Sequence, residues 1–233
     1  MNAELCVALD VAAAAEIAPV VDRLPPEVAW YKVGLELFCA EGPAALRPLQ
    51  ARGRKIFLDL KLHDIPRTVA RAVATAAQHG VQMMTVHASG GRAMLEAAAE
   101  AARSLGSARP KLVAVTVLTS LDAKDLAELG VGRTPAEQVA ALAALALDCG
   151  IDGIVCSAQE AAAMRARLGP AALLVTPGIR LPSGDLGDQK RVATPAAAVR
   201  DGATHLVVGR PILEAPDPAA AARAILADMT AGA

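Results

Sequence analysis

Short runs of apolar residues alternate along the whole chain with longer, alanine-rich segments. The runs are rich in leucine, valine and isoleucine and have the length of buried strands, whereas the segments between them have the length of helices. We predict eight strands, at residues 5–10, 30–35, 55–62, 83–88, 111–119, 153–158, 173–179 and 205–212.

The segments between the runs carry the start and stop signals of helices. Capping boxes, prolines at first helical positions and terminal glycines stand at 134–137, 157–160, 194–195, 217–218, Gly80 and Gly150. Strands that recur every roughly 20 to 40 residues with helices between them favour eight βα units over a mixed sheet. We therefore predict an α/β fold, a (β/α)8 TIM barrel, in which residues 1–233 form a single catalytic domain.

The composition limits the classes of partner. Of the 233 residues, 54% are hydrophobic, 20% are charged and 2% are aromatic, and the formal net charge is -1. Such a chain has no general attraction for nucleic acid or anionic lipid, and it offers few rings on which bases could stack. We expect neither nucleic acid nor a membrane as a partner, so any preference for an anion must be local.

The cysteines and the first residues indicate the compartment. Cys6, Cys39, Cys149 and Cys156 lie in apolar stretches without CxxC spacing, so we expect buried thiols in a reducing compartment. The start of the chain has an acid at Glu4 and no basic region, and no apolar run is long enough to cross a bilayer. We therefore expect neither a signal peptide nor a membrane span, and a cytoplasmic protein.

Polar residues gather where the predicted strands end. In barrels of this type the chemistry lies at the C-terminal ends of the strands, so polar residues there are informative. Most of the predicted strands carry one or two at this place: Asp10, Lys32, Asp59, Lys61, His87, Thr119, Ser120, Arg180 and Arg210.

The third predicted strand carries two charges on one face. Asp59 and Lys61 are two residues apart, so both point into the barrel while the leucines beside them face the helices. A buried charge is costly unless it is paired, and Lys32 and Asp64 would complete an alternating array of lysines and aspartates. A lysine flanked by carboxylates keeps its ammonium form, so Lys61 is a candidate proton donor and a poor candidate for a Schiff base.

Simpler interpretations stay open for these residues. Asp59 and Lys61 would also fit a structural ion pair, and Asp64 alone would fit the cap of the helix that follows it. His63 and His87 would fit hydrogen-bonded structural histidines. Because no cluster of histidines and acids has the spacing of metal ligands, we expect no metal site.

The loops after the last two predicted strands are suited to an anion. TPGIR (176–180) and VVGRPI (207–212) each combine a glycine with an arginine, at the two strands whose loops often bind phosphate in barrels. Gly209 would let the backbone approach a ligand, and Arg180 and Arg210 would supply charge and forked donors.

A long polar segment, residues 180–191, lies between these two loops. It would fit a disordered surface loop. At this place in a barrel we favour a lid that closes over a phosphorylated ligand, with Gln189 near its end reaching the ligand.

These segments together resemble the orotidine 5'-phosphate decarboxylase family. VALD, YKVGLELF, FLDLKLHDIPRTV, VLTS, TPGIR, DQKR and VVGRPI occur in the family's order and cover the chain from end to end. The pattern DxKxxDIPxT is highly specific. The resemblance implies a carboxy-lyase that converts orotidine 5'-phosphate to uridine 5'-phosphate, the last step of pyrimidine nucleotide synthesis, without a cofactor.

The resemblance also implies a role for each residue. Lys32, Asp59, Lys61 and Asp64 correspond to the family's charged catalytic network, with Lys61 as the proton donor. The implied assembly is a homodimer with shared active sites, in which Asp64 and Thr68 come from the second subunit. The implied substrate-binding residues are Asp10 and Lys32 at the ribose, Thr119 and Ser120 near the pyrimidine, Arg180, Gln189, Gly209 and Arg210 at the phosphate, and Asp59 and Pro177 as further contacts.

Two other functions stay open. Magnesium-dependent barrels that act on sugar phosphates, such as 3-keto-L-gulonate 6-phosphate decarboxylase or hexulose phosphate synthase, share the DxKxxD strand but resemble a pattern with an acid in place of Lys32. A non-catalytic barrel that binds a phosphorylated ligand would use the charges only for ion pairing. A cation at residue 32 disfavours a metal, and a buried lysine between carboxylates is more than a binder needs.

Overall fold

The chain folds into a closed barrel of parallel strands. The computed structural model describes residues 3–181 and 193–232, and its eight strands follow one another around the barrel in chain order. The last strand closes the ring on the first, with His205 paired to Glu4. The strands are β1 (Glu4–Ala8), β2 (Trp30–Gly34), β3 (Lys55–Leu62), β4 (Met83–His87), β5 (Lys111–Val115), β6 (Gly153–Val155), β7 (Leu173–Thr176) and β8 (His205–Val208).

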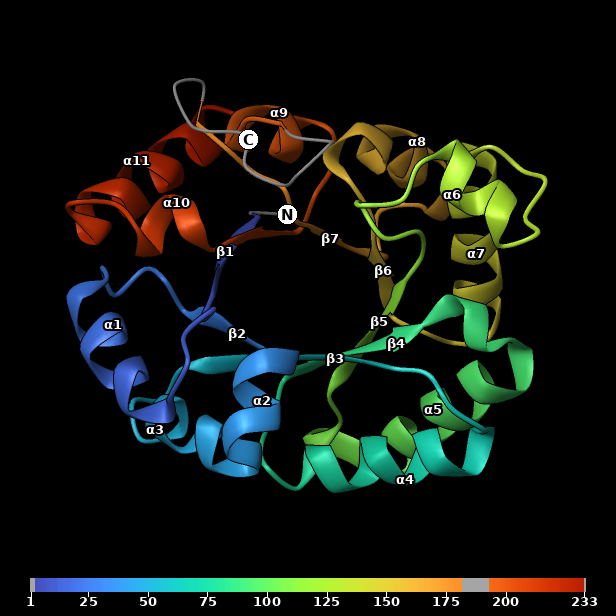
Figure 1. Cartoon of the computed structure of the whole chain (residues 1–233), viewed down its shortest axis with the longest axis horizontal. Helices are drawn as coiled ribbons and strands as arrows, with labels where there is room; N and C mark the ends of the chain where they lie inside the picture. Colours follow the sequence, from blue (N-terminus) through green and yellow to red (C-terminus); the bar gives the residue numbers. More distant parts are fainter. Residues whose placement is uncertain (1–2, 182–192, 233) are drawn as a thin grey trace.

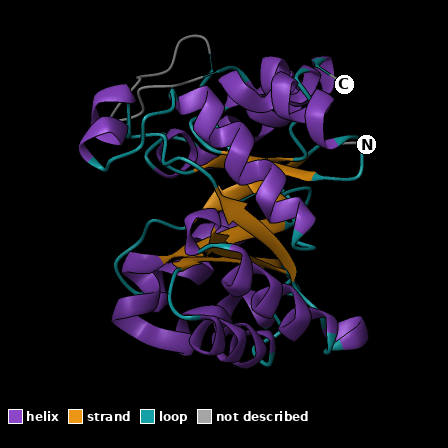
Figure 2. Cartoon of the chain, turned by 90° about the vertical axis from the view of Figure 1, so that its right-hand side faces the viewer, coloured by secondary structure: helices purple, strands orange, loops and turns teal. Residues whose placement is uncertain are grey.

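Helices form a ring around the barrel (Figure 1). In the perpendicular view the strands lie between layers of helix (Figure 2). The prediction of a (β/α)8 TIM barrel is therefore confirmed. The α-helices in the described residues are α1 (Ile17–Arg23), α2 (Leu35–Glu41), α3 (Arg47–Gln50), α4 (Pro66–Ala77), α5 (Arg92–Arg103), α6 (Ala123–Glu128), α7 (Pro135–Asp148), α8 (Ala158–Leu168), α9 (Pro195–Arg200), α10 (Arg210–Leu213) and α11 (Pro218–Ala231), with short 3₁₀ turns at Ala14–Glu16, Gly42–Leu46, Ala88–Gly90 and Gly106–Ala108.

The predicted helix starts are confirmed by their caps. The Thr134 hydroxyl accepts the N–H of Glu137 (3.3 Å), and the Glu137 carboxylate accepts the N–H of Thr134 (2.9 Å), which completes the box before α7. At the second predicted box, before α8, the Ser157 N–H donates to the Glu160 carboxylate. Each cap satisfies backbone donors that a helix start would otherwise leave unpaired.

Most strands end sooner than the sequence predicts. β3 has its predicted range, whereas β5 ends at Val115 and β6 at Val155, each several residues early. Directly after β5 the Thr116 hydroxyl donates to the carbonyl of Val155 (2.9 Å), so a side chain joins the two strands where the ladder ends. The apolar runs were longer than the strands because they continue into the mouth of the barrel.

Apolar side chains fill the middle of the barrel. Alternate residues of the strands face inward and pack on one another across the axis. This inner layer separates the two ends of the barrel, so polar sites are confined to the ends. It consists of Cys6, Ala8, Trp30, Phe57, Met83, Val113, Val175 and Val207.

Three of the four cysteines are buried as predicted, whereas Cys39 on α2 is exposed, so the prediction was wrong there. The only buried residue of α2 is Leu37, and a residue two positions along a helix lies on a different face. All four cysteines are free thiols. Within the ranges 3–181 and 193–232, no helix has both the length and the apolar composition needed to cross a bilayer.

A polar cluster, here called the floor cluster, closes the N-terminal end of the barrel. The Glu4 carboxylate accepts the indole N–H of Trp30 and pairs with Lys55 (Nζ–Oε1 3.3 Å). His205 lies edge-on to Trp30, with ring centroids 5.1 Å apart, and its Nδ1 lies 3.0 Å from the Thr204 hydroxyl. Burial lowers the pKa of His205 to about 4, although the Glu4 charge acts in the opposite direction. The imidazole is therefore neutral in the folded protein at neutral pH.

The neutral His205 makes stability sensitive to mild acid. Its pKa in the folded state lies below the ordinary value of 6.5, so only the unfolded chain takes up a proton as the pH falls from about 6.5 toward about 4. Between pH 7 and pH 5, the wild type should lose about 2 kcal/mol more free energy of unfolding than His205→Asn, which cannot titrate. Urea unfolding of both proteins at both pH values measures the difference, and equal losses would contradict the assignment.

Candidate active site

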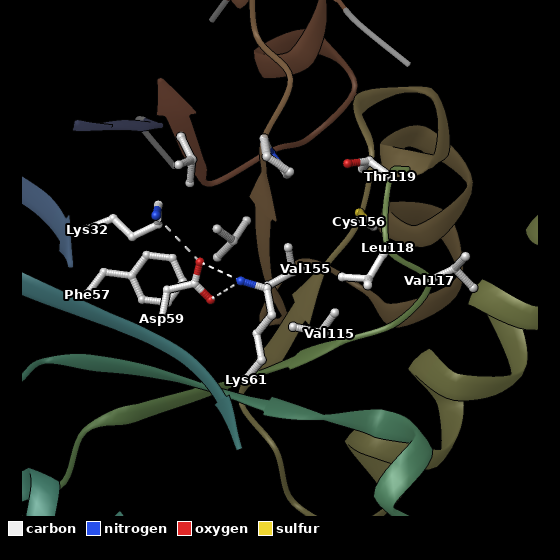
Figure 3. A pocket seen from close by; sticks show the side chains of 13 residues that line it. Lys32, Phe57, Asp59, Lys61, Val115, Val117, Leu118, Thr119, Val155 and Cys156 are labelled. Carbon is white, nitrogen blue, oxygen red and sulfur yellow. Dashed lines mark hydrogen bonds and ion pairs between the residues drawn. The ribbon is translucent and has the colours of Figure 1, made fainter. Parts of the chain in front are cut away.

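A pocket of about 170 Å³ opens at the C-terminal ends of the strands. Lys32 and Asp59 lie toward one side of it and Val117 and Leu118 toward the other, with the Lys61 ammonium group between them (Figure 3). The aliphatic part of the lining includes Val115, Val117, Leu118, Val155, Val175 and Val207. A ligand here would meet a charged wall on one side and an aliphatic wall on the other.

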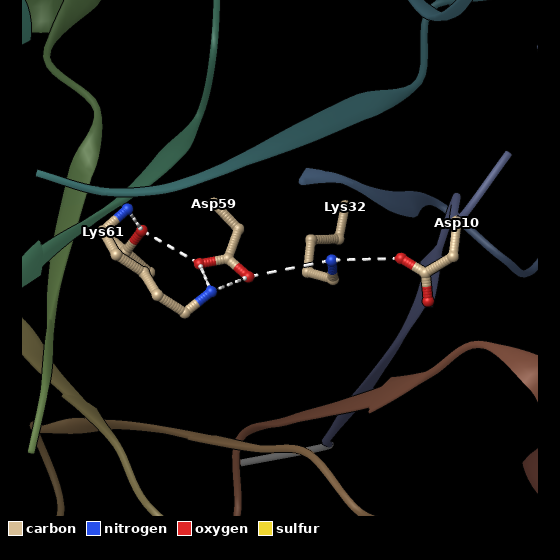
Figure 4. Close-up of polar contacts among 5 residues, drawn as sticks. Asp10, Lys32, Asp59 and Lys61 are labelled. Carbon is tan, nitrogen blue, oxygen red and sulfur yellow. Dashed lines mark hydrogen bonds and ion pairs between the residues drawn. The ribbon is translucent and has the colours of Figure 1, made fainter. Parts of the chain in front are cut away.

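Four charged side chains, here called the charged row, cross the mouth in the order Asp10, Lys32, Asp59, Lys61 (Figure 4). The Lys61 Nζ lies 2.9 Å from both carboxylate oxygens of Asp59. The Lys32 Nζ lies 3.7 Å from Asp59 Oδ2 and 3.5 Å from Asp10 Oδ1. Because the signs alternate, the buried Asp59 carboxylate has a cation on each side, which offsets the cost of its burial.

Asp64 of the same chain lies outside the charged row. It is exposed beyond the end of β3, and its Oδ1 accepts the N–H of Ile65 (2.7 Å). Within the chain the second carboxylate of the row is Asp10, which pairs with Lys32 at the end of the row opposite Lys61. Asp64 is also not the cap of α4, because Ile65 has that position. The assignment of Asp64 to the site of a second subunit stays a prediction.

A bulge in β3 turns Lys61 toward the pocket. Leu58 and Leu62 pair with Met84 and Val86 of β4, so four steps along β3 face only two steps along β4. Lys61 has φ +50°, the only positive φ of a non-glycine residue in the part of the chain that the structure describes. This conformation costs an L-residue about 1 kcal/mol or more and persists only where its surroundings hold it.

Thr85 of β4 joins the bulge to the charged row. Its side chain is buried, and its Oγ1 accepts the backbone N–H of Lys61 (2.7 Å) and donates to Asp59 Oδ1 (3.0 Å). The pattern of the sequence does not single out this residue. The signal that could have found it is its place two residues before His87, on the inward face of the same strand.

Gly209 is needed where the end of β8 passes Asp10. A Cβ at residue 209 would lie 2.8 Å from Asp10 Oδ2 and 3.4 Å from the Cβ of Ala8. Contacts this short would displace the Asp10 carboxylate. One reason for the glycine is therefore the charged row itself, in addition to the close approach of a ligand that the sequence suggests.

Of the residues predicted near the pyrimidine and at the dimer interface, some line the pocket and others are exposed outside it. Thr119 and Pro177 line the pocket, whereas Ser120 is exposed and is not part of the lining. Thr68 is exposed in the first turn of α4. A single chain therefore brings Thr119 and Pro177 to the charged row and leaves Thr68 free for other contacts.

The predicted phosphate residues lie at neighbouring strands. Arg180 follows β7, and Arg210 is the first residue of α10, directly after β8. The Arg180 N–H donates to the carbonyl of Ala193 (3.0 Å), and Ile179 forms a parallel bridge with Ala193. Arg180, at the start of the predicted lid, and Ala193, two residues beyond its predicted end, are thus held side by side. Gln189 and most of the lid lie outside the described residues.

His63 and His87 lie beside Lys61. Their rings are stacked with centroids 5.2 Å apart, and His87 Nδ1 lies 3.1 Å from the Ser89 hydroxyl. Burial lowers the pKa of His87, and the charges of His63 and Lys61 lower it further. The His87 ring, hydrogen-bonded to Ser89 and with a lowered pKa, fits the interpretation of His87 as a structural histidine. Within residues 3–181 and 193–232, no group of three or more His, Cys, Asp or Glu side chains is arranged to hold a metal ion.

Comparison with known proteins agrees with this geometry. The family model "Orotidine 5'-phosphate decarboxylase / HUMPS family" matches residues 3–225. The orotidine 5'-phosphate decarboxylase of Moorella thermoacetica is 52% identical over 231 residues, which cover 97% of this chain and 92% of the relative. That of Halorhodospira halophila is 55% identical over 227 residues, covering 97% and 96%. The crystal structure of the enzyme from Lactobacillus acidophilus superimposes with a TM-score of 0.87 at 39% identity, covering 98% of this chain and 99% of that one. This chain therefore belongs to the orotidine 5'-phosphate decarboxylase / HUMPS family.

Proposed function

We propose that this protein is a carboxy-lyase that converts orotidine 5'-phosphate to uridine 5'-phosphate. The observation that carries the proposal is the buried Asp59 carboxylate, held between the ammonium groups of Lys32 and Lys61 at the pocket. Relatives that share 52% and 55% of their residues with this chain are named for this reaction.

The reaction needs electrostatic stabilisation. When the bond between C6 of the pyrimidine and the carboxyl group breaks, CO2 leaves and the electron pair stays on C6, in the plane of the ring, where the π system cannot accept it. An ammonium group beside C6 stabilises this charge and then supplies the proton that forms the new C–H bond. Lys61 is suited to both tasks, and its lost proton returns from solvent.

Asp59 has two tasks in this proposal. Its carboxylate accepts both hydrogen bonds from the Lys61 ammonium group and so fixes the donor in place. Beside the carboxylate of the bound substrate, its charge would also disfavour the ground state by repulsion, which is relieved as CO2 leaves.

The other predicted residues would hold the parts of the substrate that do not react. The aliphatic wall suits the face of the pyrimidine ring, with Thr119, Ser120 and Pro177 near it, and Asp10 and Lys32 suit the ribose. Binding energy from these remote contacts keeps C6 beside Lys61. The phosphate would lie at Gly209, Arg180, Arg210 and Gln189, next to the strands whose loops bind phosphate in many barrels.

Lys32 disfavours the magnesium-dependent alternative. Its Nζ lies 3.5 Å from Asp10 and 3.7 Å from Asp59, so an ammonium group already stands between the two carboxylates that would attract a metal. A barrel that only binds its ligand has no need of a lysine held with φ +50°.

A homodimer with shared active sites is part of the proposal. Ile65, beyond β3, is 66% exposed, and Leu35, the first residue of α2 directly after the neighbouring β2, is 50% exposed. Large apolar side chains exposed together at one end of a barrel suit a contact with a second copy. Asp64 and Thr68 flank Ile65 and would reach the partner's pocket.

We also propose that residues 1–233 act as one catalytic domain in the cytoplasm. The strands from β1 to β8 close a single barrel, and α11 packs against α9 outside it. The exposed free thiol of Cys39 suits a reducing compartment.

Turnover in a chelator tests the reaction itself. We expect purified protein in EDTA to convert orotidine 5'-phosphate to uridine 5'-phosphate as fast as protein without EDTA, because the charged row supplies the cation. The decrease in the ultraviolet absorbance of the substrate measures the rate. Loss of turnover in EDTA and recovery with magnesium would favour the sugar-phosphate class instead.

Lys61→Ala tests the proton donor. We expect turnover to fall to that of a protein-free blank, while the affinity for uridine 5'-phosphate stays within about tenfold, because the ribose and phosphate contacts remain. Calorimetric titration of the nucleotide measures binding. Lys111→Ala removes an exposed lysine at the opposite end of the barrel and serves as the control, with turnover unchanged. Normal turnover in Lys61→Ala would refute the role of Lys61.

Complementation tests the shared site. Lys61→Ala and Asp64→Ala subunits are each expected to be inactive alone. After mixing and exchange of subunits, about a quarter of the sites should regain both residues, since half of the dimers are mixed and each has one intact site. The decarboxylase activity of the mixture, relative to that of the wild type, measures the fraction of restored sites. A mixture that stays inactive although native mass spectrometry detects mixed dimers would count against sharing.

A further inference from the structure

Thr85 lies behind the charged row, in the wall of the barrel. It is 1% exposed and is not among the residues that line the pocket, so no substrate group is expected to touch it. Its hydroxyl nevertheless contacts two parts of the charged row, the backbone of Lys61 and the carboxylate of Asp59. Any effect on chemistry must therefore act through those two residues.

The bulge explains why a side chain is needed here. Between Leu58 and Leu62 the backbone of β3 has more residues than the facing stretch of β4, so the regular ladder cannot pair all of them. The Lys61 N–H donates to the Thr85 hydroxyl instead (2.7 Å). Thr85 thus supplies the acceptor that the backbone of β4 does not supply, and it holds Lys61 at φ +50°.

The direction of each hydrogen bond is fixed by chemistry. A backbone N–H can only donate, so the Thr85 oxygen accepts from Lys61 and must donate its own proton to the Asp59 carboxylate. The same carboxylate accepts from the Lys61 ammonium group (2.9 Å). The three residues therefore form a closed ring of hydrogen bonds that begins at the backbone of Lys61 and returns to its side chain.

We propose that Thr85 is a positioning residue for the decarboxylation. Its hydroxyl fixes the backbone of Lys61 and the orientation of the Asp59 carboxylate together, so that the ammonium group points to one place in the pocket. This inference rests on the proposed role of Lys61 as proton donor. Thr85 itself neither touches the substrate nor exchanges a proton with it.

Thr85→Val removes the hydroxyl and keeps the shape of the side chain. It leaves the Lys61 N–H without its acceptor and removes one of the two donors to Asp59 Oδ1, so both groups can shift. Because a displacement of about 1 Å at a reacting group can cost about 10²-fold in rate, we expect kcat to fall by about 10²-fold. KM and the affinity for uridine 5'-phosphate should change by less than about threefold, since the ribose and phosphate contacts lie elsewhere.

Two further variants separate positioning from stability. Thr85→Ser keeps the hydroxyl and should restore kcat to within about fivefold of the wild type. Thr204→Val is the matched control, because the Thr204 hydroxyl is also buried and also accepts an N–H and contacts a carbonyl, those of Leu174, at the floor of the barrel. It should lower the melting temperature but leave kcat unchanged.

Steady-state kinetics of the four proteins, with melting temperatures, decide the matter. A kcat in Thr85→Val within threefold of the wild type would overturn the inference, and so would an equal loss in Thr85→Ser. An inactive wild type would instead show that the proposed function is wrong. Hydrogen exchange of the Lys61 amide needs no substrate, and it should be faster in Thr85→Val than in the wild type or Thr85→Ser. Unchanged exchange would overturn the inference whatever the reaction.

Discussion

The site depends on one buried carboxylate with a cation on each side. Asp59 lies between the ammonium groups of Lys32 and Lys61, and removal of its charge would leave two cations facing each other with no anion between them. Several features of the fold serve this arrangement. The bulge in β3 places Lys61, Thr85 holds the bulge, and Gly209 leaves room for Asp10 at the far end of the charged row. A function that needs a fixed positive charge beside a largely apolar pocket explains why a chain would place such residues in a buried strand.

Much of the architecture can be read from the sequence because it depends on local patterns. The strand at 55–62 and the capping boxes before α7 and α8 are set by nearby residues, and the structure has them where the pattern predicts. The two-residue spacing of Asp59 and Lys61 also places both on the inward face, since strand periodicity is a local property.

The remaining details depend on distant parts of the chain. The sequence grouped Lys32, Asp59 and Lys61 with Asp64, but within one chain the row is extended at the Lys32 end by Asp10, which follows β1, while Asp64 lies beyond the end of β3. Thr85 was missed because its importance comes from the register between β3 and β4, which the pattern of a single strand does not contain. Cys39 was expected to be buried because its neighbours in sequence are apolar. Such neighbours do not show which face of a helix is covered, and Cys39 is exposed.

The apolar layer in the middle of the barrel has a consequence for how such a protein can evolve. Phe57, Met83, Val113 and Val175 lie between the charged row and the Glu4 and His205 side chains of the floor cluster, whereas Trp30 is itself part of this layer. Changes at sites that share no partners usually add independently. Lineages can therefore replace Glu4 or His205 to suit a new temperature or acidity without altering the chemistry at the mouth. Adaptation of stability at these positions is then free of the conflict with activity that is common where stability and activity depend on the same residues.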